Sequence, residues 1–385
     1  MTSGVKGGKD MSLVCEKDKC AGCYACVSLC PTSAISIEDE MVHMNAVIDD
    51  ERCIGCGRCH RVCQSNHPAE LRKTVDSWQG WARGEVRSGS SSGGFAAAIE
   101  RAFISAGGCA ASCKLNGERF GFALARDIEG LSGFAGSKYV KSSPEGIYEP
   151  VRNELKSGGR VLFVGLPCQV SAMRNYLGTG SLVNGFYAID LICHGSPSIK
   201  ILRQALVEHG FDLGGVKEVY FRENESFGLR TDVKRVSQPG VVDPYLTAFL
   251  KGGCYTENCY SCHYARRERV GDLTLGDSWG TELKDQEDKG ISLALVQTEK
   301  GRALLEMADL DLLPVDYENA VAHNHQLEHP SLKDEGHDRF FEALLSGGSV
   351  RSASLHAYPG YCAKQTVKSV LARFGIVRRG GIPSA

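Results

Sequence analysis

The chain has 385 residues, of which 44 are Lys or Arg and 46 are Asp or Glu, so its formal net charge is −2. This balance gives no reason to expect a nucleic-acid partner. No apolar run approaches the roughly eighteen residues that cross a membrane, and residues 1–14 lack the apolar core of a secretion signal. We therefore expect a cytoplasmic protein without a membrane span, long enough for two or three domains.

Residues 1–11 are polar and rich in Gly and Lys, and we expect a mobile N-terminus there. The next segment contains eight of the seventeen cysteines, in two copies of one spacing. The first copy is Cys20, Cys23, Cys26 and Cys30, followed by proline, and the second is Cys53, Cys56, Cys59 and Cys63, followed by Gln64 where proline is usual. Residues 12–66 thus resemble bacterial two-cluster ferredoxins.

In such proteins three cysteines of each copy bind one 4Fe-4S cluster, and the fourth binds the other cluster. The spacing predicts one cluster on Cys20, Cys23, Cys26 and Cys63, and a second cluster on Cys53, Cys56, Cys59 and Cys30. Three other uses of these cysteines fit less well. Zinc needs only four ligands, disulfides need an oxidising compartment, and the CxxCH haem motifs at residues 56–60 and 259–263 are expected on exported proteins.

A run of Ser and Gly at residues 88–94 leads into a pattern with helical spacing at residues 95–106. The amide groups of such a loop, at the N-terminus of a helix, can bind an anion such as the pyrophosphate of a dinucleotide. Ordinary helix capping or a flexible linker explains the same run.

From residue 160 onward, apolar strands alternate with helices. Strands are predicted at residues 161–165, 186–193, 216–221, 273–276 and 291–297, and helices at residues 170–177, 198–209 and 299–308. A turn is predicted at residues 165–169, and Ser196 is predicted to cap the helix over residues 198–209. The fold class is therefore α+β: a two-cluster ferredoxin-like domain followed by a mixed α/β domain.

A second group of cysteines lies in this later part. Cys168 and Cys193 follow predicted strands, so parallel strands would bring both thiols to one sheet edge. Cys259 and Cys262 form a CxxC pair, and four thiolates from these segments can hold a third 4Fe-4S cluster. Cys254 is close enough in sequence to replace one of them, and buried unreactive thiols are the alternative. Cys15, Cys109, Cys113 and Cys362 have no partner at ligand spacing and are interpreted as structural thiols.

Several longer motifs resemble one known family. They are SSGGF at residues 91–95, GSKYV at 136–140, VLFVGLPCQV at 161–170, DLICHGSPS at 190–198 and CYSCHYARRERVGDLTLGDSWG at 259–280. Over residues 78–349 the chain is similar to the coenzyme F-420 hydrogenase/dehydrogenase beta-subunit family. Members of that family carry FAD and a 4Fe-4S cluster, and some have an N-terminal two-cluster ferredoxin domain.

The resemblance implies specific roles for residues of this sequence. Cys168, Cys193, Cys259 and Cys262 would ligate the third cluster, and Ser92, Gly93, Gly94, Ser137, Lys138 and Tyr139 would contact the flavin. Lysine near a flavin can stabilise negative charge on a phosphate or on the reduced ring. Asp277 and Trp279 are candidates for the wall of the same pocket. The catalytic residues are not identified.

The resemblance also implies a division into residues 78–158, a flavin-contacting region, and residues 159–349, a flavin and iron-sulfur region. The expected function is that of an iron-sulfur flavoprotein oxidoreductase, an enzyme dependent on FAD and 4Fe-4S clusters. It would pass electrons between a ferredoxin-like or deazaflavin carrier, the clusters and FAD, and would reduce or oxidise an unidentified organic substrate. The alternative is a non-catalytic electron-transfer subunit docked on a catalytic partner subunit.

Two other segments invite interpretation. His323, His325 and His329 have a spacing seen in metal sites, but a polar loop before Pro330 is favoured. Residues 350–385 are expected to form a C-terminal helix and a disordered tail. The helix has an apolar face, made of Val367, Val370, Leu371 and Phe374, that is predicted to pack on the protein's own core in preference to a membrane or partner.

Overall fold

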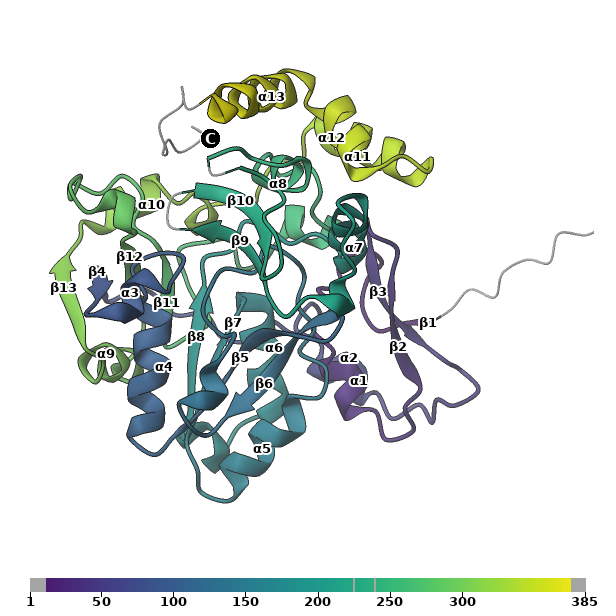
Figure 1. The fold of residues 1–385 in the computed structure, drawn as a ribbon. Helices are drawn as coiled ribbons and strands as arrows, with labels where there is room; N and C mark the ends of the chain where they lie inside the picture. The colour runs from purple at the N-terminus through teal and green to yellow at the C-terminus, as the bar shows by residue number, and fades with distance from the viewer. Residues whose placement is uncertain (1–11, 224–225, 239, 375–385) are drawn as a thin grey trace, which may run out of the picture.

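The structure, a computed structural model, describes residues 12–223, 226–238 and 240–374. The predicted mobile N-terminus at residues 1–11 and the predicted tail from residue 378 lie outside the described residues. The described chain has an N-terminal ferredoxin-like part beside a larger domain built on a mixed sheet (Figure 1). The fold class predicted from the sequence is confirmed.

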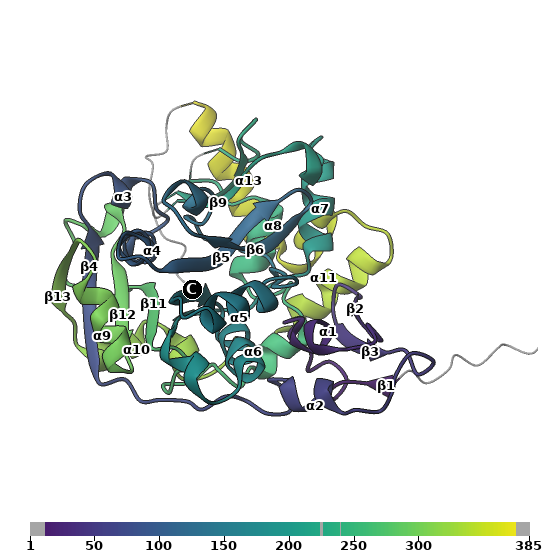
Figure 2. The same ribbon diagram turned by 90° about the horizontal axis from the view of Figure 1, so that it is seen from below.

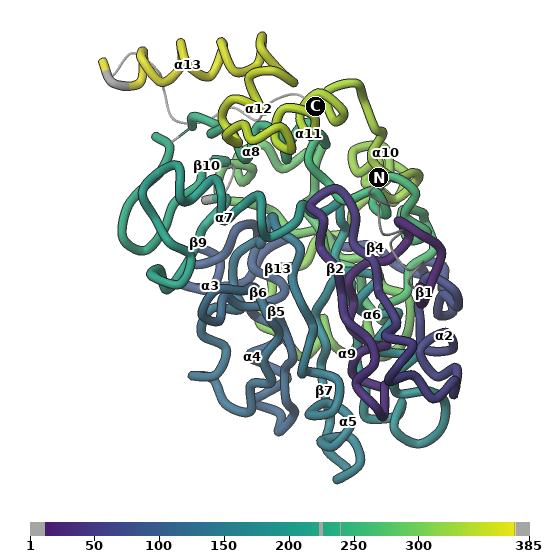
Figure 3. The backbone as a smooth tube through the Cα atoms, turned by 90° about the vertical axis from the view of Figure 1, so that its right-hand side faces the viewer, coloured from purple at the N-terminus to yellow at the C-terminus, as the bar shows by residue number. Residues whose placement is uncertain are grey.

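The ferredoxin-like part is small and contains one antiparallel sheet and two short helices. Its elements are β1 (Ser12–Leu13), α1 (Ala25–Leu29), β2 (Ile35–Asp39), β3 (Met44–Ile48) and α2 (Arg58–Val62). The strand order is β1-β3-β2, and α1 packs against α2. Figure 3 shows the molecule from the side on which this part lies.

The larger domain is organised around an eight-stranded sheet with the strand order β13-β4-β12-β11-β8-β7-β5-β6. Its strands are β4 (Asp76–Ala82), β5 (Cys109–Asn116), β6 (Arg119–Ala125), β7 (Val161–Gly165), β8 (Phe186–Leu191), β11 (Leu273–Asp277), β12 (Ser292–Val296) and β13 (Leu310–Pro314). Neighbours among β5, β7, β8 and β11 are parallel, and antiparallel strands flank them. A separate hairpin is formed by β9 (Val219–Glu223) and β10 (Ser226–Thr231).

Helices cover both faces of the parallel strands. The helices of this domain are α3 (Glu85–Ser88), α4 (Phe95–Ser105), α5 (Tyr148–Lys156), α6 (Pro167–Leu177), α7 (Ile199–Glu208), α8 (Pro244–Leu250), α9 (Glu299–Glu306), α10 (Tyr317–Ala322), α11 (Glu335–Leu345), α12 (Val350–Ala357) and α13 (Pro359–Arg373). Alternate residues of β7 point to opposite faces. Leu162 and Val164 join the core under α4 and α9, whereas Val161 and Phe163 join the core with α5 and α6.

The ferredoxin-like part shares a hydrophobic core with the larger domain. Val14, Ala25 and Val62 belong to the same buried cluster as Tyr148 of α5 and Val170 of α6. Both α1 and α2 contact α6, so α6 lies between the ferredoxin-like part and the sheet (Figure 2). The two parts therefore pack through a continuous apolar interface.

Most of the predicted elements are present, and two helix starts differ from the prediction. The strand at residues 161–165 is observed as predicted. The next helix begins at Pro167 instead of residue 170, because proline fits the first position of a helix, where no amide donor is needed. Helix α7 begins at Ile199. Its cap is Ser198 and not the predicted Ser196, and the Ser198 side chain accepts a hydrogen bond from the Lys200 amide.

The C-terminal helix does not bury the apolar face that was predicted to pack on the protein's own core. Helix α13 is present, at the edge of the molecule beside α12 (Figure 1), but Val367 and Phe374 are 59% and 75% exposed. The helix contacts the domain through other residues: Tyr361 packs on the core, and the Gln365 side-chain oxygen accepts a hydrogen bond from the Val242 amide. No helix in the described ranges is long and apolar enough to cross a membrane.

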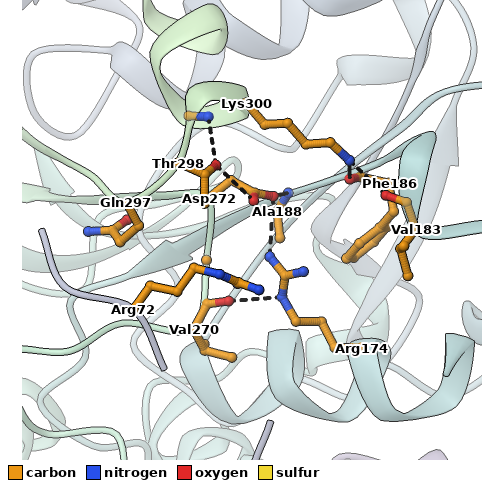
Figure 4. A network of polar contacts seen from close by, with 12 residues as sticks. Arg72, Arg174, Val183, Phe186, Ala188, Val270, Asp272, Gln297, Thr298 and Lys300 are labelled. Carbon is orange, nitrogen blue, oxygen red and sulfur yellow. Dashed lines mark hydrogen bonds and ion pairs between the residues drawn. The ribbon is translucent and has the colours of Figure 1, made fainter. Parts of the chain in front are cut away.

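A buried carboxylate fixes the parallel strands against two helices (Figure 4). Asp272, which directly precedes β11, accepts hydrogen bonds from the Ala188 amide at 2.9 Å, from Thr298 Oγ1 at 3.0 Å and from Arg174 Nη2 at 3.2 Å. Arg174 belongs to α6, and Thr298 caps α9. Asp272 thereby connects β8 and β11 with the helices on both faces of the sheet.

Replacement of Asp272 by Ala is expected to lower the free energy of unfolding by about 3 to 5 kcal/mol, because the mostly buried Arg174 guanidinium loses its counterion. Anaerobic urea titration followed by circular dichroism measures this change. The matched control is Glu335→Ala, which breaks an exposed ion pair and is expected to cost less than about 1 kcal/mol. Equal effects of the two substitutions would contradict the role given to Asp272.

Candidate iron-sulfur and flavin sites

The first candidate site is a small cavity inside the ferredoxin-like part. It is lined by Cys20, Cys23, Cys26 and Cys63, the four thiols predicted for one cluster. Cys26 lies in α1 and Cys63 directly follows α2, so the packing of α1 on α2 brings the distant cysteine to the loop. A fifth thiol, that of Cys15, lines the same cavity.

The two cysteine loops have the same backbone geometry. Gly22 and Gly55 occupy equivalent positions and adopt φ values of 64° and 68°, a left-handed conformation that glycine reaches without strain. Their amides donate hydrogen bonds to Cys20 Sγ and Cys53 Sγ, each at 3.4 Å. Donors aimed at sulfur are a means by which proteins tune iron-sulfur potentials.

The second candidate site lies nearer the surface. Its cavity is lined by Cys30, Cys53, Cys56 and Cys59, the set predicted for the second cluster, and Cys53 and Cys56 are exposed. Ile54 between them is 66% exposed. The Ala34 amide donates to Cys30 Sγ at 3.2 Å, so this distant cysteine is also held by the backbone.

The thiols of these sites fit clusters better than single ions. In the parts of the chain that the structure describes, no three His, Cys, Asp or Glu side chains converge on one point as a single ion requires. Four thiols distributed around one cavity suit a cube whose iron corners each take one thiolate. Burial raises the pKa values of the Cys23 and Cys26 thiols, so these groups must release protons when they bind iron.

A third group of thiols meets at the carboxyl end of the parallel sheet. Strands β7 and β8 are parallel neighbours, so Cys168 at the start of α6 and Cys193 after β8 lie at the same edge. Together with Cys259 and Cys262 they line a cavity of about 270 Å³. Cys254 is buried in the neighbouring apolar core and is not among the residues that line this cavity.

The ferredoxin-like part reaches this third cavity directly. Its residues Lys19, Ala21 and Gln64 line the cavity. Tyr264 donates a hydrogen bond to Gln64 Oε1 at 2.7 Å, and Lys19 Nζ donates to Ser261 Oγ at 2.8 Å. Gln64, which occupies the usual proline position, therefore connects the end of the second cysteine motif with the third set of thiols.

A larger cavity of about 280 Å³ lies on the other side of the Cys193 segment. Of the residues implied to contact a flavin, Ser92, Gly94, Ser137, Lys138 and Tyr139 line it. The Ser137 amide donates a hydrogen bond to Ser91 Oγ at 2.9 Å, which joins the two predicted loops.

Gly93 is behind the wall of this cavity. A Cβ atom at Gly93 would lie 2.4 Å from the Gly80 carbonyl oxygen and 2.5 Å from the Ser292 nitrogen, so the close approach of strands β4 and β12 requires glycine there. Its own carbonyl accepts a hydrogen bond from Ala82. Gly93 thus positions the loop, whereas its neighbours face the cavity.

The third cavity and the larger cavity share one wall. The residues that line both are Leu166, Gln169, Cys193, His194, Gly195 and Ser196. Gln169 is fixed by hydrogen bonds to the Leu166 amide and the Ser142 hydroxyl. The Cys193 segment thus separates a site lined by four thiols from a site lined by the predicted flavin contacts.

The larger cavity also contains ionisable residues that sequence reasoning missed. Glu100, in α4, and Cys113, in β5, line it beside Lys138. Lys138 Nζ donates to the Phe134 and Ala135 carbonyls at 2.6 and 2.7 Å. Burial raises the pKa of Glu100 to about 7 and lowers the pKa of Lys138. The sequence contains one indication of this buried glutamate, because Glu100 follows Ile99 on the apolar face of a predicted helix.

Asp277 and Trp279, proposed from the sequence as wall residues, both line the larger cavity. Asp277 Oδ2 forms an ion pair with Arg222 Nη1 at 2.6 Å, and the Arg222 guanidinium lies over the Trp279 ring at 5.2 Å. The β9–β10 hairpin, which contains Arg222, is therefore attached to this side of the cavity.

The three histidines of residues 323–329 form no site of their own. The rings of His325 and His329 stack at 5.2 Å, and His323 contacts the Asn319 carbonyl within its own helix end. The His325 ring lies edge-on to His194, with centroids 5.6 Å apart. These contacts agree with the interpretation as a polar loop.

Two families of known proteins match this chain. Residues 158–314 match the carboxyl-terminal region of the beta subunit of coenzyme F420 hydrogenase/dehydrogenase. That match covers less than half of the chain. Residues 19–67 match the 4Fe-4S dicluster domain. Both resemblances inferred from the sequence are confirmed, and they identify an iron-sulfur protein of electron transfer.

Among solved structures, the chain is similar to one from the xenon-derivatised F420-reducing NiFe hydrogenase complex of Methanosarcina barkeri. The two are 19% identical with a TM-score of 0.47, and the similarity covers 81% of this chain and 97% of that chain. None of the curated proteins gives a significant match.

The pKa of Glu100 predicts a pH effect on stability. Its pKa rises from 4.5, the ordinary value, to about 7 when the chain is folded, so the protonated form is favoured by folding. This contribution is fully present below about pH 4 and is lost as the pH rises to about 7. Relative to the unchanged protein, Glu100→Gln should therefore gain about 2.5 kcal/mol of stability as the pH rises from 5 to 8.

The measurement is the free energy of unfolding of both proteins across this pH range, under anaerobic conditions. Glu299→Gln, at an exposed position of α9, is the matched control and should show no such trend. A difference between Glu100→Gln and the unchanged protein that is the same at every pH would rule out burial as the cause.

Proposed function

We propose that the chain is an iron-sulfur flavoprotein oxidoreductase. It exchanges electrons with a ferredoxin-like or deazaflavin carrier, and it reduces or oxidises an organic substrate at a flavin. The observation that carries this proposal is the wall formed by the Cys193 segment, because it lines both the third thiol cavity and the larger cavity. A cluster and a flavin held on its two sides would be close neighbours.

The proposed ligands follow from the thiols that share each cavity. Cys20, Cys23, Cys26 and Cys63 hold the first cluster, Cys30, Cys53, Cys56 and Cys59 hold the second, and Cys168, Cys193, Cys259 and Cys262 hold the third. The exposed second site is the point where a carrier meets the chain, since its thiols reach the surface. The buried first site borders the third cavity, since Ala21, Gln64 and Ser65 line both.

FAD would occupy the larger cavity. The phosphates would lie at the Ser92 and Gly94 loop, where α4 begins and its first amides lack helical partners. Lys138 supplies a positive charge to the same cavity, and the Tyr139 ring is fixed by stacking on Phe249 at 4.5 Å. When bound, the flavin couples the one-electron chemistry of clusters to two-electron chemistry on a substrate.

A second function is favoured by the name of the matched family. The family model describes part of a beta subunit, so this protein can serve as an electron-transfer component of a larger redox complex, with a catalytic partner subunit. In that case the purified protein would contain its clusters and flavin but reduce no small molecule alone. A partner that copurifies at one copy per chain would favour this alternative.

The composition of the purified protein tests the proposal. Anaerobic purification is expected to give about twelve irons, about twelve sulfides and one FAD per chain, because each 4Fe-4S cluster contributes four irons. Chemical analysis and the released flavin's spectrum measure these contents. About eight irons without flavin would restrict the function to the dicluster domain and contradict the proposal.

The third cluster is tested by Cys193→Ser. Loss of this thiolate is expected to lower the iron content from about twelve to between eight and eleven per chain, because the cluster is lost or loses its unligated iron. Cys254→Ser is the matched control, since Cys254 is a buried neighbour that does not line the cavity, and its iron content should stay unchanged. An unchanged iron content in Cys193→Ser would exclude Cys193 as a ligand.

A further inference from the structure

The first cavity contains one thiol more than a cluster needs. Five cysteines line it, whereas four line the second cavity. The additional residue is Cys15, whose side chain is buried at 9% exposure. Cys15 has no partner at ligand spacing along the chain, but folding places it at the cavity that Cys20 and Cys63 also line. These two residues come from different cysteine motifs.

The backbone around Cys15 holds it in this position. The Val14 amide donates to the Ala46 carbonyl at 2.9 Å, which continues the pairing of β1 with β3. The Val14 carbonyl accepts a hydrogen bond from Asn66 Nδ2 at 2.8 Å, which ties this segment to the chain just after Cys63. The residue before Cys15 is therefore anchored through both its amide and its carbonyl, and Cys15 lines the cavity from a segment that is not part of either cysteine loop.

We propose that Cys15 is a reserve ligand of the first cluster, and this inference rests on the ligand assignment of the proposed function. When Cys63 or Cys20 is missing, the Cys15 thiol loses its proton to solvent and its sulfur forms the iron bond that the missing cysteine would have made. No electron is gained or lost in this exchange. The first cavity adjoins the third cavity, with Ala21, Gln64 and Ser65 lining both, so a reserve ligand keeps a cluster next to the third site.

The test compares iron and sulfide contents of anaerobically purified variants. Cys63→Ala is expected to keep the full content, about twelve irons per chain in the proposed assignment, with a changed electron paramagnetic resonance signal for one cluster. The double variant with Cys15→Ala and Cys63→Ala should lose one to four irons. Cys15→Ala alone should keep all of them. Bound FAD and the circular dichroism spectrum show whether each variant is folded.

Cys53→Ala is the matched control, because the second cavity has no fifth thiol among the described residues that line it and this variant should lose iron. If Cys63→Ala loses as much iron as Cys53→Ala, the reserve role is overturned. It is also overturned if the double variant keeps its iron, because another ligand then replaces Cys63. If the unchanged protein already lacks the expected iron, the ligand assignment fails instead, so the two failures are distinguishable.

Discussion

A buried ion pair holds two cysteine-containing segments of the chain in one arrangement. Arg269 Nη2 lies 2.6 Å from Asp190 Oδ1, and the two side chains are 2% and 0% exposed. Asp190 is in β8, three residues before Cys193, and Arg269 follows Cys262 by seven residues. Removing the counterion of an ion in this environment costs several kcal/mol. Two of the three segments that supply the third set of thiols are therefore fixed to each other.

The same arginine extends this constraint to the ferredoxin-like part. Its backbone exchanges hydrogen bonds of 2.7 and 2.8 Å with Arg72, in the segment that leaves that part, and its Nη1 donates to the Tyr264 carbonyl. Tyr264 in turn contacts Gln64. Through its guanidinium and its backbone, Arg269 thus links the sheet, the later cysteines and the segment that leaves the ferredoxin-like part.

The sequence predicts those features that depend on local spacing. The interleaved cysteines can be assigned to two cavities because the spacing itself describes the loop, and Cys168 and Cys193 can be placed together because parallel strands end at one edge. Cys15 and Glu100 could not be predicted, since their roles depend on which distant segments pack against them. The exposed face of α13 was missed for the same reason, because the contacts of Tyr361 and Gln365 with distant segments accompany its docking.

We propose that electrons reach the flavin through the third site at the Cys193 wall. The most direct measurement is stopped-flow reduction of the purified protein by a reduced two-cluster ferredoxin, a donor too large to enter the larger cavity. Flavin bleaching is expected to follow cluster bleaching in the unchanged protein. In Cys193→Ser that retains its FAD, the clusters should still bleach, but the flavin step should be at least tenfold slower. A tenfold change corresponds to about 1.4 kcal/mol in activation free energy. Flavin bleaching at an unchanged rate in Cys193→Ser would contradict the proposal.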